Sequence, residues 1–541
     1  MFFAPVPAIE RVMFRTGAQR TYPTVDTPAD WYGILPDAGE QEPLCTYRIA
    51  NFKTASADKD AGAAFLKYKD FKPYVDYFNS MEDENIAQAI PNARASQWME
   101  ENIPLFECSQ KNFEEMYYYR WWTLRKHIKE TPVGYGMTEF LVNRSYADKY
   151  NLIACAIGHH IYESRWLRNP EYLNQIIHTW YRGNEGGPMA KMTKFSSWNA
   201  DAEFLLDMVK DLEAEYARWE KTNRLPNGLY WQGDVQDGME ESISGGRRKQ
   251  YARPTINSYM YGNAKALSLI GIMTGDEGMA MKYGLKADSI KTLVQDKLWN
   301  TDHHFFETMR GDASAEVREA IGYIPWYFNL PDASSKYTVA WKEVMDEKGF
   351  SAPYGLTTAE RRHPEFRTHG VGKCEWDGAI WPFASAQTLT AMANFMNNYP
   401  QTVLTDSVYF HQMERYVESQ HHRGRPYIGE YLDEVTGYWL KGDQERSRYY
   451  NHSTFNDLMI TGLIGLRPRM DNTVEVNPLI PEGKWDYFCL DNVLYHGRNL
   501  TILWDKDGSR YQRGKGLHIY VDGKEVGHAD TLTRVLCENV L

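Results

Sequence analysis

The sequence predicts a mainly α-helical protein, an α/α toroid followed by a small antiparallel β module. From about residue 61 to 466, hydrophobic residues recur at three- and four-residue spacing between connections rich in Pro, Gly and Asn. After residue 466 the pattern changes to short β-branched or aromatic runs separated by turn sequences. No repeat of fixed period is present, which argues against a solenoid. About a dozen helices in one domain favour a ring in which the loops at one end form a cup for ligands.

The helical body is predicted to span residues 61–466, after an extended arm of residues 1–60 that is rich in Pro, Gly and Asp. Weaker helical patterns lie near 70–80, 90–102 and 170–182. The stronger patterns cover Asn112–Lys129, Ser145–Leu167, Trp198–Lys221, Ile256–Thr274, Gly278–Leu298, Tyr337–Glu347, Gly378–Asn398, Asp406–His421 and Ser453–Leu466.

Residues 467–541 are predicted to form an antiparallel β-sandwich module. Its strands are expected at Thr473–Val476, Trp485–Leu490, Val493–Tyr495, Leu500–Trp504 and Leu517–Val521. The turn signals between and after them are Asp491-Asn492, His496-Gly497, Asp507-Gly508 and Asp522-Gly523. Because so short a segment buries little core alone, the module is expected to pack on the helical body.

Composition excludes several classes of partner. Acidic residues outnumber basic ones and the formal net charge is −12, so neither nucleic acid nor an anionic membrane surface is an expected partner. No window is long and apolar enough to span a membrane. The start, Met1–Ala8, lacks the features of a signal peptide, so the compartment stays open; an earlier leader, if removed, would allow a periplasmic or secreted location.

No cofactor or metal is expected. The six cysteines lie far apart and form no CxxC pair, and P-loop, GxSxG, HExxH and EF-hand motifs are absent. The three histidine doublets place adjacent side chains on different faces, which makes poor metal clamps. The unusual feature is the aromatic content, 14% of the chain, with 17 Trp and 37 Tyr. Aromatic faces stack on the C–H faces of sugar rings, so a carbohydrate ligand is one interpretation and a core of large residues is the other.

The first candidate site is a glycine-rich acidic loop, residues 228–246. It contains Asp237, Glu240 and Trp231, and it precedes a helix that is expected to begin near Arg253. Closely spaced like charges raise carboxyl pKa values, the condition for an acid that stays protonated near neutrality. The alternative is a solvated acidic loop that caps the next helix.

Two further loops combine carboxylates with aromatic residues. One, residues 429–439, contains Glu430; the other, residues 374–382, places Trp376 and Trp381 at a helix start. Glycoside hydrolysis needs two carboxyl groups, one to protonate the leaving group and one to activate water or attack the sugar. These loops therefore indicate a glycosidase.

In these three loops the chain resembles the six-hairpin glycosidases, most closely glycoside hydrolase family 63 and mannosylglycerate-hydrolase-like proteins. That family has a Gly-x-Asp-x-Ser/Ala segment with the general acid, and here Gly238-Met-Glu240-Glu-Ser242 puts Glu in place of Asp. Its Trp-x-Gly-x-x-Trp-Pro sugar-subsite segment matches residues 376–382 closely. Its Glu-x-Tyr-x-x-x-Thr-Gly segment with the general base matches residues 430–437, with the tyrosine moved next to Glu430.

The resemblance implies an (α/α)6 barrel and exo-acting, inverting hydrolysis of a terminal α-linked sugar of glucose or mannose type from an oligosaccharide or glycan. Carried over, Glu240 is the general acid and Glu430 the general base, while Asp237 stays an alternative acid because of the Asp-to-Glu departure. The substrate-binding candidates are Trp231, Arg253, Asn257, Trp376, Asp377 and Trp381. Two further segments, residues 119–122 and Thr138-Glu139-Phe140, lie near loops that could complete the pocket, although a structural role is expected first.

Two alternatives remain open. Polysaccharide lyases also use α/α toroids, and Tyr450 and His452 with Arg446 and Arg448 nearby fit a lyase pattern; the negative net charge and the ordered carboxylate motifs argue against it. The other alternative is a sugar-binding relative that has lost catalysis, which the Asp-to-Glu departure permits. The sequence indicates neither the sugar and linkage nor the oligomeric state.

Overall fold

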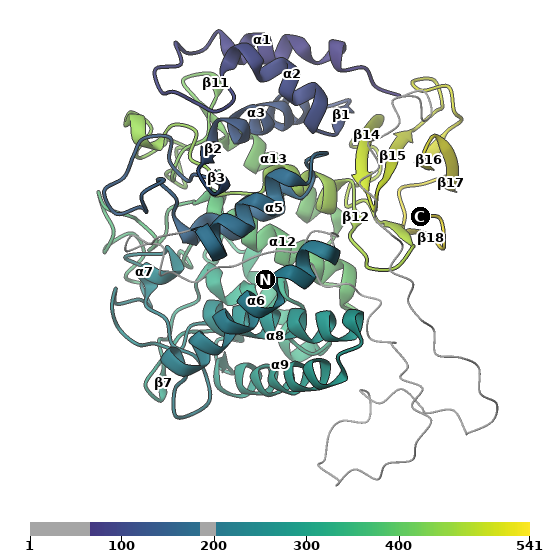
Figure 1. Ribbon diagram of the computed structural model, residues 1–541. Helices are drawn as coiled ribbons and strands as arrows, with labels where there is room; N and C mark the ends of the chain where they lie inside the picture. Colours follow the sequence, from purple (N-terminus) through teal and green to yellow (C-terminus); the bar gives the residue numbers. More distant parts are fainter. Residues whose placement is uncertain (1–64, 184–201) are drawn as a thin grey trace, which may run out of the picture.

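A computed structural model describes residues 65–183 and 202–541; the side chains of 202 and 203 are not described. The predicted N-terminal arm and the first residues of the segment predicted from Trp198 lie outside these ranges. Figure 1 shows a helix-rich body with a smaller sheet module at one side, formed mainly by the C-terminal residues. This confirms a mainly helical chain with a small C-terminal sheet module.

The first helices of the body pack around α3. They are α1 (Lys72–Asn79), α2 (Asn92–Asn102) and α3 (Lys111–His127). From Met116 to His127, every residue of α3 is buried, so it is a core helix rather than an amphipathic surface helix. The ring of Phe78 on α1 contacts Tyr119 and Trp122 of α3.

The predicted helix Ser145–Leu167 is only partly helical, because α4 spans Ile157–Ser164. In the first half the Asp148 carboxylate accepts hydrogen bonds from the backbone amides of Tyr150 (2.8 Å) and Leu152 (2.7 Å). Asn151 has a left-handed backbone, with φ of 66°, and its side chain donates to the carbonyl of Phe140 at 2.8 Å. These local bonds favour a turn over a helix, although the hydrophobic spacing looks helical.

The next elements are a hairpin of β2 (Ile128–Thr131) and β3 (Gly134–Met137), then α5 (Glu171–His178), which continues as a π-helical turn to Gly183. After the segment outside the described ranges come α6 (Ala202–Asn223) and α8 (Pro254–Thr274).

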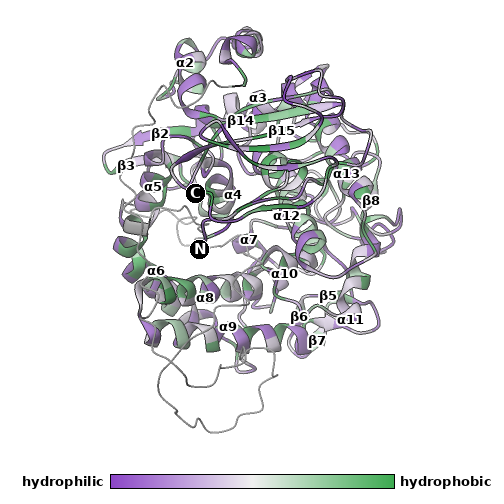
Figure 2. Cartoon of the chain, turned by 90° about the vertical axis from the view of Figure 1, so that its right-hand side faces the viewer, coloured by the Kyte–Doolittle hydropathy of each residue, from purple (hydrophilic) through white to green (hydrophobic). Residues whose placement is uncertain are grey.

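Helices α8 and α9 (Glu277–Lys297) form a hairpin, side by side in Figures 1 and 2. Pro254 occupies the first turn of α8 and Gly275 its left-handed C-terminus, with φ of 73°. At Gly271 a Cβ would lie 2.5 Å from the backbone of Ala280, so the close approach of the helices requires glycine. Along α9, hydrophilic and hydrophobic residues alternate in Figure 2, as expected for a helix with one buried face.

The second half of the body consists of α12 (Pro382–Asn398), α13 (Asp406–Ser419) and α14 (Phe455–Asp457), which continues as a π-helical turn to Leu463. The shorter elements are α7 (Asp234–Asp237), α10 (Ile324–Tyr327), α11 (Ser335–Thr338) and the strands β4 (Trp299–Asn300), β5 (Phe305–Phe306), β6 (Met309–Arg310), β7 (Ala313–Ser314), β8 (Ser351–Ala352), β9 (Gly355–Leu356), β10 (His421–His422) and β11 (Arg425–Pro426). Long loops between these elements carry most of the predicted site residues, while Asp237 is the last residue of α7 and Asn257 lies in α8.

The larger sheet of the C-terminal module has the strand order β1-β14-β15-β16-β17, and all its pairs are antiparallel. Its strands are β1 (Leu105–Cys108), β14 (Tyr487–Tyr495), β15 (Arg498–Asp505), β16 (Gly516–Val521) and β17 (Lys524–Ala529). A second antiparallel sheet contains β12 (Leu466–Arg467), β13 (Val474–Val476) and β18 (Val535–Cys537).

Two features of this module differ from the sequence-based expectation. Strand β1 comes from the helical body, so residues after 466 do not form the sheet alone. The predicted turn at Asp491-Asn492 is an irregularity inside the continuous strand β14. The Asp491 carboxylate explains this, because it accepts a hydrogen bond from Thr501 on β15 (2.6 Å) and so stays in the sheet.

The module packs on the helical body, as predicted. Trp485 is 1% exposed, and its ring contacts Phe106 of β1, Phe113 of α3 and Phe410 of α13. Its indole donates to the side chain of Gln110 at 3.1 Å. The interface between the sheet module and the helical body is therefore a continuous aromatic core rather than a polar domain interface.

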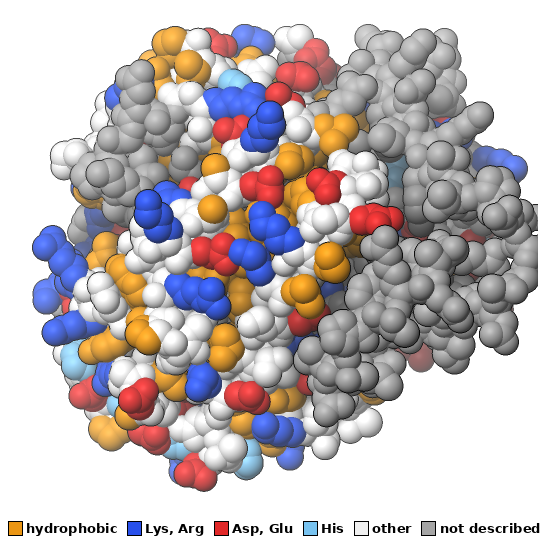
Figure 3. Space-filling model, turned by 60° about the horizontal axis from the view of Figure 1, so that its bottom comes forward, with side chains coloured by type: hydrophobic (Ala, Val, Ile, Leu, Met, Phe, Trp, Pro, Cys, Tyr) orange, Lys and Arg blue, Asp and Glu red, His pale blue; other side chains and the backbone are white. Residues whose placement is uncertain are grey.

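None of the described helices combines the length and the apolar composition that crossing a membrane requires. Figure 3 shows acidic and basic side chains interspersed on the face it presents.

Candidate active site

The loop that carries Glu240 is shaped by Asp234 at the start of α7. One oxygen of the Asp234 carboxylate accepts a hydrogen bond from the backbone amide of Gly246 (3.1 Å), which closes the loop on itself. Gly238 ends α7 with a left-handed φ of 74°, and a Cβ there would lie 3.2 Å from Cys155. This geometry turns the chain so that Glu240 follows a tight turn.

Glu240 keeps some exposed surface, yet the protein encloses its carboxyl closely. Burial raises the pKa of this carboxyl to about 7, and the negative charges of Asp234 and Glu430 act in the same direction. Near neutral pH, Glu240 therefore exists in both protonated and ionised forms, as a general acid requires.

Asp237 has a different environment, although it lies in the same loop. Its Oδ2 accepts hydrogen bonds from Arg253, with which it forms an ion pair, and from Thr255 (2.7 Å). Burial raises the pKa of the Asp237 carboxyl, while the positive charge of Arg253 opposes this. The ion pair ties Asp237 to the start of α8.

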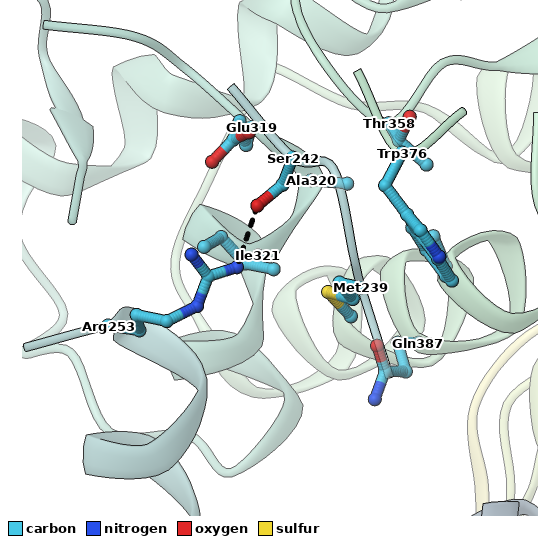
Figure 4. Close-up of a pocket in the computed structure, with 10 residues that line it drawn as sticks. Met239, Ser242, Arg253, Glu319, Ala320, Ile321, Thr358, Trp376 and Gln387 are labelled. Carbon is cyan, nitrogen blue, oxygen red and sulfur yellow. Dashed lines mark hydrogen bonds between the residues drawn. The ribbon is translucent and has the colours of Figure 1, made fainter. Parts of the chain in front are cut away.

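Arg253 is completely buried and lines a small cavity, which Figure 4 shows. Its guanidinium also donates to Ser244 (3.2 Å) and Ser242 (3.4 Å). Trp376 lines another part of the wall. The loop with Glu240 and the loop with Trp376 therefore meet at one cavity, although they are far apart in the sequence.

Asn257 supports the backbone near Trp231, at the start of the Glu240 loop. The Asn257 side chain accepts a hydrogen bond from the amide of Tyr230 (2.8 Å) and donates to the carbonyls of Tyr230 and Arg253, both at 2.9 Å. These bonds use the donors and the acceptor of its amide, so Asn257 holds the backbone beside Trp231 rather than facing a ligand. Trp231 itself is half-buried.

Glu430 lies in the loop between α13 and α14 and is 4% exposed. Its Oε2 accepts hydrogen bonds from Arg446 (3.0 Å) and Ser447 (3.1 Å). Burial raises the pKa of the Glu430 carboxyl, and the positive charge of Arg446 counteracts this. The arginine therefore favours the carboxylate form, which a general base needs.

The rings of the two predicted tryptophans stack on each other. The rings of Trp376 and Trp381 are 4.0 Å apart and nearly parallel, and Tyr431 stacks on Trp381 at 4.5 Å. Both faces of Trp381 are thus covered by aromatic rings. The indole nitrogens of Trp376 and Trp381 have no hydrogen-bond partner within the described ranges, so the pair offers N–H donors rather than two open faces.

Asp377, between the two tryptophans, fixes a neighbouring loop. Its Oδ2 accepts hydrogen bonds from the backbone amides of His369 (2.6 Å) and Gly370 (3.0 Å). Because the side chain is fully buried, these amides provide the polar contact that a buried carboxylate needs.

A third carboxyl group, Glu139, joins the site. It is 4% exposed and accepts hydrogen bonds from the hydroxyl of Tyr450 and from the thiol of Cys155 (3.5 Å). Burial raises the pKa of Glu139 to about 8, and the charges of Glu430 and Glu240 act in the same direction. From the sequence, the segment Thr138-Glu139-Phe140 was expected to have a structural role first and to complete the pocket only second.

The residues of the lyase alternative have other partners. Tyr450 donates to Glu139, Arg446 pairs with Glu430, and Arg448 pairs with Glu82 at 3.2 Å. Burial lowers the pKa of His452 well below its usual value. Tyr450 and Arg446 therefore contact the carboxyl cluster, whereas Arg448 is paired elsewhere.

The fold and these loops define a glycoside hydrolase domain. The family model of the mannosylglycerate hydrolase MGH1-like glycoside hydrolase domain matches residues 149–453, and the chain belongs to this family. The match covers the loops of Glu240, Trp376 and Glu430, which confirms the predicted resemblance. Residues 466–528 match the C-terminal domain of glycosyl hydrolase family 65, and residues 1–31 match a sialidase-like CBM domain.

Solved structures give further similarities. A protein named "Sialidase" is 77% identical with a TM-score of 0.87; the match covers 97% of this chain and 50% of that protein, so this chain spans about half of its length. A family GH78 rhamnosidase of Bacillus sp. GL1 is 9% identical with a TM-score of 0.51, covering 74% of this chain and 40% of the rhamnosidase, a likeness of fold alone. A GH63 mannosylglycerate hydrolase from Thermus thermophilus is 11% identical with a TM-score of 0.40, covering 61% of this chain and 77% of that one.

Proposed function

We propose that the protein is an exo-acting, inverting glycosidase whose helical body is an (α/α)6 barrel. Its substrate is a terminal α-linked sugar of glucose or mannose type on an oligosaccharide or glycan. Glu240 is the general acid and Glu430 the general base. The single observation that carries this proposal is that two enclosed carboxyl groups come from the two predicted loops, and that the negative charge of Glu430 raises the pKa of Glu240.

In the proposed reaction, Glu240 donates its proton to the glycosidic oxygen as the bond from that oxygen to the anomeric carbon breaks. Glu430 takes a proton from a water molecule, whose oxygen attacks the anomeric carbon from the opposite face. The sugar leaves with inverted configuration, and both carboxyl groups then exchange protons with solvent. The surroundings fit these roles, since Glu240 has its pKa raised to about 7 while Arg446 and Ser447 hold the carboxylate of Glu430.

The choice of Glu240 over Asp237 rests on their partners. Asp237 is in an ion pair with Arg253 and also binds Thr255, so protonating the sugar would require breaking a buried ion pair. Hydrogen-bond partners of that kind are absent for the Glu240 carboxylate among the described residues. Asp237 is proposed to position the loop.

The substrate belongs to the same proposal. The family name points to mannosylglycerate and the similar protein named "Sialidase" to a sialoside. Both belong in the first substrate panel beside α-glucosides and α-mannosides.

Substitution of the two carboxyls tests the proposal. Glu430→Gln and Glu240→Gln are each expected to lower kcat on a natural glycoside by at least about a hundredfold, because each removes a proton-transfer group. Glu241→Gln is the matched control: Glu241 is the neighbour of Glu240 but pairs with Arg247 at the surface. Near-wild-type turnover of Glu430→Gln would refute the assignment, provided that thermal unfolding shows all three variants folded.

A further inference from the structure

Two of the loops of the candidate site meet at Arg367. Its guanidinium pairs with the carboxylates of Glu375 and Glu434, the latter at 2.7 Å. Glu375 lies in the tryptophan loop, residues 374–382, and Glu434 lies in the base loop, residues 429–439, which carries the proposed general base. One side chain therefore joins two loops that are distant in the sequence.

These ion pairs are shielded from water. The side chain of Arg367 is 18% exposed, that of Glu375 5% and that of Glu434 11%. Ion pairs between fully exposed side chains contribute little, so this enclosure distinguishes the pairs of Arg367 from a surface contact. A guanidinium can bind both carboxylates at once, because its N–H donors lie in a rigid planar fork.

The backbone at Arg367 has an unusual conformation. Its φ of 56° is left-handed, which is uncommon for a residue other than glycine or asparagine. Its amide donates to the carbonyl of Asp377 (2.9 Å), and the ring of the preceding residue, Phe366, lies against Gly378, where a Cβ would come within 2.5 Å of that ring. The surrounding structure thus holds a strained backbone in place, which points to a specific role for the side chain that it carries.

The base loop reaches the aromatic stack through Tyr431. The ring of Tyr431 stacks on Trp381 (4.5 Å), and its hydroxyl donates to the carbonyl of Lys373 (2.5 Å). Glu430 is the neighbour of Tyr431 in the chain. A shift of the base loop against the tryptophan loop would therefore move Glu430 relative to the stacked rings.

We propose that Arg367 is a positioning residue, which holds the tryptophan loop and the base loop together so that Glu430 keeps its place beside the aromatic stack. The inference rests on the proposed function, since it assigns a role in the same reaction. Arg367 takes up no proton and needs no contact with the sugar. Small displacements of a reacting group cost much of the rate, so the loss of such a residue lowers kcat.

The test variants make use of the left-handed backbone. Arg367→Gly removes the side chain at a φ that glycine adopts without strain. Arg423→Gly is the matched control, because Arg423 also has a left-handed φ, of 51°, and pairs with Asp443 at 2.6 Å, but its side chain is 74% exposed. Glu434→Gln weakens only the link from Arg367 to the base loop.

The first measurement is kcat per folded molecule, on whichever of p-nitrophenyl α-glucoside and p-nitrophenyl α-mannoside wild type hydrolyses faster. We expect kcat to fall about tenfold or more in Arg367→Gly and in Glu434→Gln, and to stay within about twofold of wild type in Arg423→Gly. Methylguanidinium can occupy the space left in Arg367→Gly, so it should restore part of the lost kcat there. It should change nothing in Glu434→Gln, where Arg367 is still present. Sodium chloride at the same concentration is the salt control, and thermal unfolding confirms that each variant is folded.

The second measurement is amide hydrogen exchange, which needs no turnover. The amides of Ile380 and Leu432 each donate to the other's carbonyl at 3.0 Å, so their exchange reports the contact between the two loops. In Arg367→Gly, the peptides that contain these two amides are expected to exchange faster than in wild type, and methylguanidinium should slow them again. In Arg423→Gly they should exchange as in wild type.

Three outcomes would overturn the inference. One is faster exchange in Arg367→Gly that is confined to the tryptophan loop, and another is a kcat no lower than that of Arg423→Gly. The third is a loss of kcat without faster exchange in the base loop, because Arg367 would then act by another route. Failure of the proposed function gives a different result: wild type releases no sugar from any glycoside, while exchange in the base loop still depends on Arg367.

Discussion

At the scale of single residues, the same loop gives two carboxyl groups different chemistry. Arg253 and Thr255 hold Asp237, while Glu240 is enclosed next to the charges of Asp234 and Glu430. The contrast arises because the tight turn at Gly238 separates the two side chains. Environment therefore distinguishes the proposed acid from its neighbour where residue type does not.

The pKa of Glu240 predicts the pH dependence of the reaction. A general acid must be protonated, so kcat/KM is expected to fall as the pH rises through about 7, where the Glu240 carboxyl loses its proton. In Glu240→Gln, hydrolysis of an aryl glycoside with a good leaving group needs no acid and should lack this alkaline fall. An unchanged alkaline fall in that variant would assign the acid to another group.

Glu139 shows the limit of motif analysis at this scale. Glu240 and Glu430 were proposed from the sequence because glycine and aromatic residues surround them in recognisable spacing. Glu139 lies outside the family match. Its hydrogen-bond donors are Tyr450, which is distant in the sequence, and Cys155, which lies in another element. Only the fold brings these groups together.

At the scale of elements, hydrophobic spacing predicted the long helices well, and local polar bonds decided the exceptions. The helix expected from Ile256 is α8, and that expected from Asp406 is α13. The segment after Ser145 instead forms a turn around Asp148 and Asn151. A hydrophobic pattern does not reveal such competition between side chain and backbone.

Buried histidines connect elements around the site. His127 on α3 contacts the carbonyl of Tyr449 (2.6 Å), and His160 on α4 contacts that of Asn451 (2.7 Å). Together they tie two helices to the segment that carries Tyr450. Burial lowers the pKa of His127 to about 3 and that of His160 to about 4, so both are neutral in the folded protein at ordinary pH.

These histidines predict loss of stability in acid. Below about pH 6.5 an unfolded histidine takes up a proton that folded His160 refuses until about pH 4, so stability falls as the pH decreases through this window. The cost is on the order of 2 kcal/mol for His160 at about pH 5. His160→Gln should therefore lose less unfolding free energy than wild type between pH 7 and 5, in denaturant titrations at both pH values. Equal losses would show that His160 is protonated in the folded state.

At the scale of the whole molecule, the sheet module and the helical body share one core. The sequence predicted that the module packs on the body, but not that β1 would supply a strand from residues 105–108. That strand is short and buried, and its partner β14 lies almost four hundred residues later, so no local pattern indicates the pairing. Long-range strand pairing is the information that the sequence pattern lacks.

The shared core predicts one cooperative unfolding transition. Trp485→Ala removes the ring that joins β1, α3 and α13, and should lower the free energy of unfolding by about 3–5 kcal/mol while leaving a single calorimetric transition. Leu536→Ala is the control, since Leu536 is 53% exposed on β18. Two separate transitions in wild type would show that the module and the body fold independently.

The central claim is inverting hydrolysis by Glu240 and Glu430, and a proton NMR time course of the released sugar tests it most directly. The panel contains α- and β-linked disaccharides, aryl glycosides, mannosylglycerate and a sialoside. The account predicts that sugar from an α-linked glucoside or mannoside appears first as the β-anomer, before mutarotation. Release of the α-anomer first, or release of no sugar from any member of the panel, would contradict it.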